Sequence, residues 1–488
     1  MNPKEMPARL ITADPGIPRS NPTDSYWQRV PSPLANVKST SLPDCVDFVI
    51  IGSGITGASV SKAILESNAN VRIALLEART LCSGATGRNG GQLATNAGES
   101  YASLAAKFGP KVARQIVQLT FDTVDRMRKV IQEHDPDHCD FQNTTKVRSY
   151  LDEPLFQAAK ESIQKLEFDH PDLKGMYRVV EASSLKQFGV SEGVGGILHS
   201  AGTVWPYRLI TRIFEKLLQN HSQRFSIDTE TPVTAISHEG TTSRPYLVKT
   251  PRGLIRCSKV IHCTNGYAGH LLPGLRGRTF PICGSMSVQN LEDIVPKPKT
   301  PYSWAFHYPP YSDPITKTVS DGLNYLARNP KSNLFFFGGD NSSWENVLHA
   351  DDRQQSPSST GNLLKLLPFL LAGKHRLPKE YQKQLVSAWT GVMGFSSDGL
   401  PIVGELPSSV TTRSGTGELA AVAFNGYGMP NCWLVGEALA EIALGKKIPT
   451  WLPGPYLLND HRLQESLSIE KSVQSLGDFG EMYSEPRP

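Results

Sequence analysis

The chain has 488 residues, of which 39% are hydrophobic and 20% charged, a balance typical of a globular protein with two or three domains. Its 50 basic and 46 acidic residues leave a net charge of +4 with no basic block, so we expect neither nucleic acid nor an anionic membrane as a partner. No apolar run approaches the roughly 20 residues that span a bilayer. The seven cysteines are scattered without a C-x-x-C, which predicts no metal site and a reducing, cytoplasmic setting.

The first 44 residues are rich in proline, serine and asparagine and show no clear periodicity. Such a composition predicts an extended N-terminal arm. Tyr26 and Trp27 are the large aromatic side chains in this stretch, and we expect their packing on the body of the protein to hold the arm in place.

The next segment, residues 45–57, is the most informative part of the chain. An apolar run rich in β-branched residues meets Gly52, Gly54 and Gly57, which are spaced G-x-G-x-x-G, and a helical pattern follows. Gly52 permits a tight strand-to-helix turn, Gly54 lets a pyrophosphate approach the backbone, and Gly57 lets the helix pack closely on the strand. Phosphates would then meet the free N–H groups and the positive end of the helix dipole.

A second apolar run, from Val71 to Leu76, ends at Glu77, twenty residues after Gly57. A carboxylate at this point accepts hydrogen bonds from a ribose 2′-hydroxyl and repels a 2′-phosphate. The alternative is an ordinary glycine turn followed by a surface glutamate. Strand, glycines, helix, second strand and acidic residue in register favour a site for an ADP moiety.

Residues 83–92 contain four glycines and are predicted to form neither a regular helix nor a strand. Their backbone can approach a flat ring or phosphates closely, and Arg88 and Asn89 add hydrogen-bond donors. A flexible surface turn is the alternative. The position of this loop, soon after Glu77, favours the cofactor.

The middle of the chain alternates between helical and strand patterns. Residues 101–135 look helical, and residues 144–195 read as a strand, a charged helix and a glycine-rich return. A helix begins near Pro206, with proline in its first turn. Short strands are then expected at residues 232–236, 246–250, 254–257 and 260–263. In this meander Val233 would place its backbone near an adenine, although a plain β-meander is the alternative.

Aromatic residues crowd the segment 276–387, particularly from Tyr302 to Phe337. Core packing is the default role for such side chains, and the wall of a substrate cavity is the functional alternative. His307 is a candidate base, although a lone histidine is more often structural.

Towards its C-terminal end the chain returns to patterns that suit a cofactor. Trp389 precedes a glycine- and proline-containing turn at residues 398–404, and a strand at 419–424 leads through the loop 425–430 into a helix from 431 to 443. Apolar strand, glycine loop and helix make a second anion-binding helix start. Directed at a flavin, its positive end would stabilise the anionic reduced ring.

These motifs together resemble the D-amino-acid-oxidase (DAO) type superfamily of FAD-dependent oxidoreductases, and in particular its fungal members. The superfamily includes enzymes that oxidise glycine, sarcosine and D-amino acids. The likeness covers residues 45–450 and is carried, in the family's order, by residues 51–57 with Glu77, 85–91, 202–206, 263–273, 398–404 and 425–429.

The resemblance implies an α/β fold in which a glutathione-reductase-type FAD-binding Rossmann domain is interleaved with an α+β substrate domain containing a large antiparallel sheet. The FAD domain would comprise residues 45–135, 201–275 and 388–455, and the substrate domain residues 136–200 and 276–387. Residues 1–44 and 456–488 would form an N-terminal arm and a C-terminal tail.

The motifs and the resemblance together predict the site residues. The expected FAD-binding residues are Gly52, Ser53, Gly54, Ile55, Thr56, Gly57, Glu77, Ala78, Arg79, Thr86, Arg88, Asn89, Gly90, Gly91, Gln92, Val233, Thr264, Asn265, Gly266, Asp398, Gly426, Tyr427, Gly428 and Met429. The candidate catalytic residues are His307, Tyr325, Arg328 and Trp389. No metal ligand is expected.

The resemblance implies oxidation of a C–N bond in an amine or amino acid, by hydride transfer to flavin N5, with molecular oxygen as the electron acceptor. One departure from the family is the run 281–285, where many relatives carry an arginine and this chain has neither an arginine nor a lysine. Arg328 and Arg148 are alternative clamps for a carboxylate. The departure leaves open a tailoring enzyme that dehydrogenates a C–C or C–O bond of a larger metabolite, and a non-catalytic flavoprotein.

Overall fold

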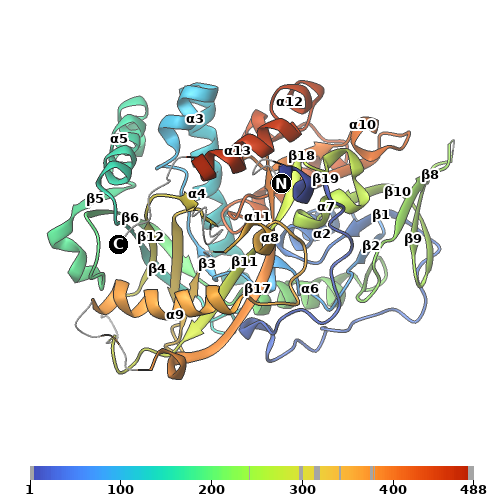
Figure 1. Ribbon diagram of the computed structural model, residues 1–488. Helices are drawn as coiled ribbons and strands as arrows, with labels where there is room; N and C mark the ends of the chain where they lie inside the picture. Colours follow the sequence, from blue (N-terminus) through green and yellow to red (C-terminus); the bar gives the residue numbers. More distant parts are fainter. Residues whose placement is uncertain are drawn as a thin grey trace.

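The computed structural model describes residues 5–481 except 241, 296–299, 313–318, 340–341, 374–376 and 378–379. Two large sheets, one of eight strands and one of nine, lie side by side with helices packed around them (Figure 1). No helix within the described residues is long and apolar enough to cross a membrane.

The eight-stranded sheet has a parallel centre. Its main path runs β18 (Ile402–Glu405), β19 (Glu418–Val422), β10 (Gly253–His262), β1 (Cys45–Ile51), β2 (Ile73–Leu76) and β7 (Phe225–Asp228). The hairpin of β8 (Ala235–His238) and β9 (Tyr246–Thr250) extends from β10 and projects at the edge of the molecule (Figure 1). Strands β19, β10, β1, β2 and β7 are mutually parallel, so their carboxyl ends share one edge of the sheet, where open α/β sheets bind ligands.

The nine-stranded sheet is antiparallel except where β12 and β4 pair in parallel. Its main path runs β17 (Leu385–Ser396), β11 (Thr279–Gln289), β16 (Phe335–Gly338), β15 (Leu323–Arg328), β12 (Tyr302–His307), β4 (Gln142–Tyr150), β6 (Gly195–Thr203) and β3 (Gln92–Leu93), with β5 (Arg178–Glu181) beside β6. A separate short pair joins β13 (Tyr311–Ser312) and β14 (Val319–Ser320). The two sheets confirm the predicted α/β class with a large antiparallel sheet.

Helices cover both sheets. In chain order they are α1 (Glu5–Thr12), α2 (Ile55–Ser67), α3 (Tyr101–Phe108), α4 (Pro110–Glu133), α5 (Glu153–Asp169), α6 (Pro206–His221), α7 (Ala268–Leu271), α8 (Trp344–Val347), α9 (Pro357–Ala372), α10 (Ser408–Thr411), α11 (Cys432–Ala443), α12 (Asp460–Glu465) and α13 (Ile469–Glu481). Helix α2 follows the glycine turn at residues 52–54, and helix α11 follows the loop at residues 425–430. These two helices pack against each other, and α9 lies across β11 and β16 (Figure 1).

Several expected elements differ from those observed. The two strands predicted at 254–257 and 260–263 are one strand, β10, because its first half pairs with β9, its second half pairs with β19, and β1 runs alongside both halves. Strand β7 was not predicted. The N-terminal arm contains α1, and the C-terminal tail contains α12 and α13, of which α13 packs on α1. Strands β3 and β17 belong to the nine-stranded sheet, although the sequence assigns residues 92–93 and 388–396 to the FAD domain.

The rest of the N-terminal arm is held by aromatic packing, as predicted. The Trp27 ring stacks on Phe336 with a centroid distance of 3.9 Å, and Tyr26 meets the same ring edge-on at 5.4 Å. The arm also bonds to the glycine-rich loop of residues 83–92. The indole N–H of Trp27 donates to the carbonyl of Asn89 (2.6 Å), and Ser25 Oγ donates to the carbonyl of Gly87 (2.7 Å).

Candidate functional site

A cavity of about 1030 Å³ lies between the two sheets. Its walls on one side are the segments that follow β1, β2, β10 and β19, at the carboxyl ends of those parallel strands. Its walls on the other side are strands of the nine-stranded sheet. The volume is at the upper end of the range for cofactor and ligand sites.

The glycines after β1 create space at one end of this cavity. Gly52 has φ +108°, and a Cβ there would lie 2.7 Å from the carbonyl oxygen of Cys263. A Cβ on Gly57 would lie 2.0 Å from the carbonyl oxygen of Gly52, so a glycine at this position lets the first turn of α2 lie close against the turn that follows β1. Gly54 precedes the first residue of α2, so the positive end of that helix dipole faces the cavity.

Glu77 lies in the cavity wall just after β2 and is 8% exposed. Its carboxylate accepts hydrogen bonds from the backbone N–H and the hydroxyl of Ser53 (3.0 and 2.6 Å) and from the backbone N–H of Arg79 (3.0 Å). The acidic residue therefore links the end of β2 to the glycine turn after β1.

We expect Glu77→Ala to weaken FAD binding by about 1.5–3 kcal/mol, because hydrogen bonds to a charged acceptor are lost at the ribose and at Ser53. Fluorescence titration of the apoprotein with FAD measures the change in Kd. Glu66→Ala, on the exposed face of α2, is the control, since Glu66 pairs with Lys62 at the surface. An unchanged Kd for Glu77→Ala would contradict this role.

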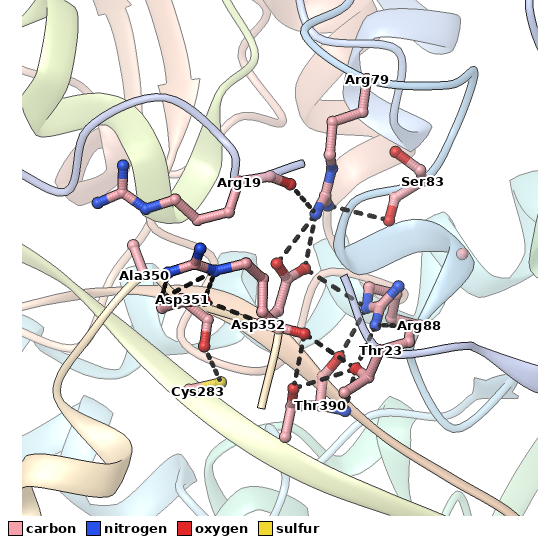
Figure 2. Close-up of polar contacts among 12 residues, drawn as sticks. Arg19, Thr23, Arg79, Ser83, Arg88, Cys283, Ala350, Asp351, Asp352 and Thr390 are labelled. Atoms are coloured by element: carbon pink, nitrogen blue, oxygen red, sulfur yellow. Dashed lines mark hydrogen bonds and ion pairs between the residues drawn. The ribbon is translucent and has the colours of Figure 1, made fainter. Parts of the chain in front are cut away.

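A buried cluster of charges lies beside the glycine-rich loop (Figure 2). The Asp352 carboxylate, 1% exposed, accepts hydrogen bonds from Arg79 Nη1 to both its oxygens at 2.9 Å and lies 3.6 Å from Arg88 Nε. Burial lowers the pKa of Arg88 to about 10, against the opposing effect of Asp352. Burial also disfavours the charged form of Arg79, but Asp352, Tyr267 and Glu77 together outweigh burial and raise the pKa of Arg79.

This cluster joins four parts of the chain. Arg88 Nε donates to the carbonyl of Thr390 on β17 (2.6 Å), and its Nη2 donates to the carbonyl and hydroxyl of Thr23 in the arm. Thr23 N–H in turn donates to the carbonyl of Asp352 (2.8 Å). Arg79 and Arg88, both predicted to bind FAD, line the cavity. Their guanidinium groups, however, are bonded to acceptors of the protein itself.

The opposite wall of the cavity is one face of the nine-stranded sheet. Five strands line it, four of them through alternate residues: Lys146, Arg148 and Tyr150 on β4, Ala305 and His307 on β12, Leu323 and Tyr325 on β15, Gly284 and Met286 on β11, and, on β17, Gly391, Val392, Met393 and Phe395. Successive strand residues point to opposite faces, so the aromatic residues between these positions face away. Trp304, Phe306, Phe335 and Phe337 accordingly pack in a core with α9.

Charged side chains gather at the β4 end of this wall. Arg148 Nε lies 2.8 Å from Glu99 Oε1, and both side chains are buried. Burial raises the pKa of Glu99 to about 7 in spite of Arg148. Burial opposes the charge on Arg148, but Glu99 and Tyr427, whose hydroxyl hydrogen-bonds to Arg148, raise its pKa and keep it cationic. Burial and the nearby Arg148 lower the pKa of Lys146 well below its ordinary value.

His307 stacks on Tyr150 with a centroid distance of 4.8 Å. Burial, followed by the charge of Arg148, lowers its pKa well below the ordinary value, so its imidazole is neutral. Its Nε2 atom finds no hydrogen-bond partner among the residues that the structure describes. The neutral ring therefore offers the cavity a polar edge.

Most of the predicted site residues line the cavity. Among the FAD-binding candidates these are Gly52, Ser53, Gly54, Ile55, Thr56, Glu77, Ala78, Arg79, Thr86, Arg88, Asn89, Gly90, Gln92, Val233, Thr264, Asn265, Gly266, Gly426, Tyr427, Gly428 and Met429. His307 and Tyr325 line it from the sheet. Gly57, Gly91, Asp398, Arg328 and Trp389 do not.

The residues outside the cavity have structural partners. Asp398 accepts from Arg462 Nε (2.8 Å), which ties the turn after β17 to α12. The Trp389 indole N–H donates to the carbonyl of Arg88 (2.8 Å) behind the glycine-rich loop. Arg328 lies on the other face of β15, with its guanidinium carbon 4.8 Å from the centre of the Phe335 ring. Gly91, with φ +67°, packs against Trp27.

Sequence reasoning missed Glu99 and Lys146. The strand predicted at the start of the segment 144–195 carries Lys146, Arg148 and Tyr150 at alternate positions, and this spacing alone would have placed all three on one face. Glu99 lies in a loop, and nothing in its local sequence distinguishes it from a surface residue. Residues 281–285 contain no arginine or lysine, and the cations on the sheet wall of the cavity, Lys146 and Arg148, come from β4 instead.

The residues present fit FAD. The glycine turn after β1 leaves room for a pyrophosphate beside a helix N-terminus, and Val233 and Glu77 line the part of the wall expected near adenosine. Thr264 Oγ1 and Gln92 Nε2, both in the cavity wall, are buried without a hydrogen-bond partner within the described part of the chain. The described residues contain no group of three or more His, Cys, Asp or Glu side chains that could hold a metal ion.

Comparisons with known proteins agree with this fit. Residues 47–442 match the model of the DAO family, described as FAD dependent oxidoreductase. The chain is 22% identical to gamma-glutamylputrescine oxidoreductase of Escherichia coli (strain K12) over 428 residues, covering 87% of this chain and 89% of that protein. It is 23% identical to sarcosine oxidase subunit beta of Rhizobium meliloti (strain 1021) over 374 residues, covering 74% and 77% of the two chains.

Solved structures share the fold. Glycine oxidase from Geobacillus kaustophilus superposes with a TM-score of 0.63 at 16% identity, covering 86% of this chain and all of that one. L-proline dehydrogenase from P. horikoshii gives a TM-score of 0.61 at 16% identity, over 85% and 97% of the two chains. The family match extends over most of the sequence and includes the segments after β1, β2, β10 and β19 and the strands of the large sheet that line the cavity, and the chain belongs to the DAO family of FAD-dependent oxidoreductases.

Proposed function

We propose that this protein oxidises a C–N bond of a small amine or amino acid. The observation that carries the proposal is the pairing, in one cavity, of the glycine motifs that fit FAD with a sheet face bearing Arg148, Glu99 and Lys146. The relatives named as oxidising glycine, proline, sarcosine and gamma-glutamylputrescine support the same chemistry. Bound FAD would supply the hydride acceptor.

The chain's own residues would bind and orient the substrate. Ser53, Gly54 and Glu77 would hold the pyrophosphate and ribose of the cofactor, and Tyr325 and His307 would bound the substrate space. Arg148, kept cationic by Glu99, would hold a carboxylate through charge-assisted hydrogen bonds. Fixing the substrate in a buried cavity lowers the barrier because orientation is supplied in advance.

The proposal extends to three finer points. Molecular oxygen would accept the electrons, the protein would act in the cytoplasm, and the chain would group with the fungal members of the family. The first rests on the oxidase names among the relatives, the second on seven cysteines that are all free thiols, and the third on the motif resemblance.

The test is anaerobic bleaching of the flavin absorbance of the purified holoenzyme by glycine, sarcosine, L-proline and putrescine, with matched alcohols as controls. Bleaching by an amine or amino acid supports the proposal. Bleaching by the alcohols alone would contradict it and would favour dehydrogenation of a C–O bond.

Two arginine variants then test the carboxylate clamp. We expect Arg148→Met to reduce the bleaching rate with amino acids by about 10²-fold or more, because removal of a charged partner from a buried anion costs several kcal/mol. Arg328→Met should leave the rate within about twofold, because Arg328 lies on the opposite face of the sheet. Equal effects of the two substitutions would contradict the assignment.

A further inference from the structure

Lys146 is a buried amine in the cavity wall that donates two hydrogen bonds to neighbouring oxygens. It lies on β4 and is 2% exposed, and its Nζ donates to the backbone carbonyl of Trp304 (2.6 Å) and to Oε1 of Gln92. Trp304 lies behind the cavity wall, whereas Lys146 and Gln92 line the cavity. The amine is therefore held at a fixed place on the substrate side of the sheet.

These two bonds match the capacity of a neutral amine. A neutral –NH₂ group has two N–H donors and one lone pair, and its two donors are taken by Trp304 and Gln92. The remaining hydrogen-bonding position of the nitrogen is then its lone pair, which is an acceptor. An ammonium group would carry a third N–H at the same position. The two forms therefore differ in whether the cavity meets a proton acceptor or a proton donor.

The surroundings favour the neutral form. The ionisable groups that face Lys146 are Glu99 from the loop before α3, Arg148 on the same strand, His199 on β6 and His307 on β12. Burial and Arg148 lower the pKa of Lys146, while Glu99 raises it. His199 and His307 are themselves held neutral by burial.

Oxidation of an amine needs a proton acceptor. Amines are mostly ammonium ions at neutral pH, and an ammonium has no lone pair to assist departure of a hydride from its α-carbon. An acceptor in the cavity therefore removes one barrier to the proposed reaction, and general bases of this kind contribute about 10²–10⁴-fold in rate.

We propose that Lys146 is the base that deprotonates the substrate's ammonium group before oxidation. The proton passes from the substrate nitrogen to the lone pair of Nζ, so that R–NH₃⁺ and Lys146–NH₂ become R–NH₂ and Lys146–NH₃⁺. The new N–H of Lys146 then faces the cavity, and the proton returns to water after the product leaves. This inference rests on the proposed function, because it concerns the same amine substrate.

The first test needs no substrate. Cyanate carbamylates neutral amines, so the holoenzyme is treated with cyanate at pH 7 and each lysine is followed by peptide mass spectrometry. Lys146 should react at least about tenfold faster than Lys165, which lies at the exposed rim of the same cavity and pairs with Asp169 (3.0 Å). Cyanate is smaller than any amine substrate, so a Lys146 that stays unmodified would overturn the proposal.

The second test uses the amine that bleaches the wild-type flavin fastest. In Lys146→Met the rate of flavin reduction at pH 7 should fall by about 10²-fold or more and should recover as the pH approaches the ionisation of the free amine. Wild-type activity should persist to lower pH and fall only as Lys146 itself becomes protonated. An equal loss at every pH would identify a merely structural residue and would overturn the proposal.

The Glu99→Gln variant distinguishes Lys146 from Glu99 as the base. If Lys146 is the base, this variant keeps a base-dependent acid limb in its pH profile; if the limb disappears, Glu99 is the base and the proposal fails. Lys62→Met removes a lysine of α2 that does not line the cavity, and it is the control for the loss of a lysine elsewhere in the protein. If no amine bleaches the flavin, the proposed function fails, whereas the cyanate result still reports the state of Lys146.

Discussion

Gly57→Ala is expected to give a protein that purifies without FAD. A methyl group at this position would lie 2.0 Å from the carbonyl oxygen of Gly52, far inside van der Waals contact. The first turn of α2 must then move away from the glycine turn, and its N–H groups leave the place where they meet the pyrophosphate. Overpacking of this kind costs about 1–3 kcal/mol in stability, and we expect the larger value here because both partners are backbone.

The ratio of flavin to protein absorbance in the purified variant measures this effect, and circular dichroism reports whether the fold survives. Gly361→Ala is the matched control, because a Cβ on that residue of α9 meets nothing within 4 Å. It should keep full FAD content and gain slightly in stability, since alanine is the better helix former. A Gly57→Ala protein with wild-type FAD content would show that close packing of α2 is not required.

Asp352→Asn should destabilise the protein by about 3–5 kcal/mol, because it leaves the buried cations of Arg79 and Arg88 without a counter-charge. The same substitution loosens Arg88, whose other bonds hold the arm at Thr23 and β17 at Thr390 (Figure 2). FAD content should therefore fall together with stability. Urea denaturation of the two holoproteins gives the difference in the free energy of unfolding.

The neighbouring Asp351→Asn is the control for this change. Asp351 pairs with Arg353 at the surface, where the two side chains are 30% and 49% exposed, and such pairs contribute at most about 1 kcal/mol. The two variants remove the same charge at adjacent positions, so net charge does not distinguish them. Equal effects on stability would mean that the buried cluster does not depend on Asp352.

The cofactor half of the site could be predicted because its signals are local. Gly52, Gly54, Gly57 and Glu77 perform their roles through the backbone turn and the two strands beside them, and these interactions span few residues. The helix at Pro206 and the strand at 246–250 were likewise predicted from short patterns and are present as α6 and β9. In these segments the spacing of apolar residues and glycines is itself the structural requirement.

The sheet side of the cavity, which is proposed to hold the substrate, is formed by contacts between distant segments. The sequence alone therefore could not decide which of the candidate residues line it. Arg148 and Arg328 were equal alternatives as a carboxylate clamp, and the strand pairing places Arg148 in the cavity and Arg328 behind β15. Trp389 and Asp398 sit in motifs typical of flavin proteins, but their partners are Arg88 and Arg462, which no local pattern connects to them.

The sequence by itself determined the family, the cofactor and the wall of the cavity that fits the cofactor, because each rests on short motifs whose geometry is set by adjacent residues. Only the tertiary structure decided which charged groups line the sheet side of the cavity. Glu99, Lys146 and Arg148 line the same part of the cavity because the loop before α3 lies against the face of β4. Burial, which no sequence pattern records, lowers the pKa of Lys146.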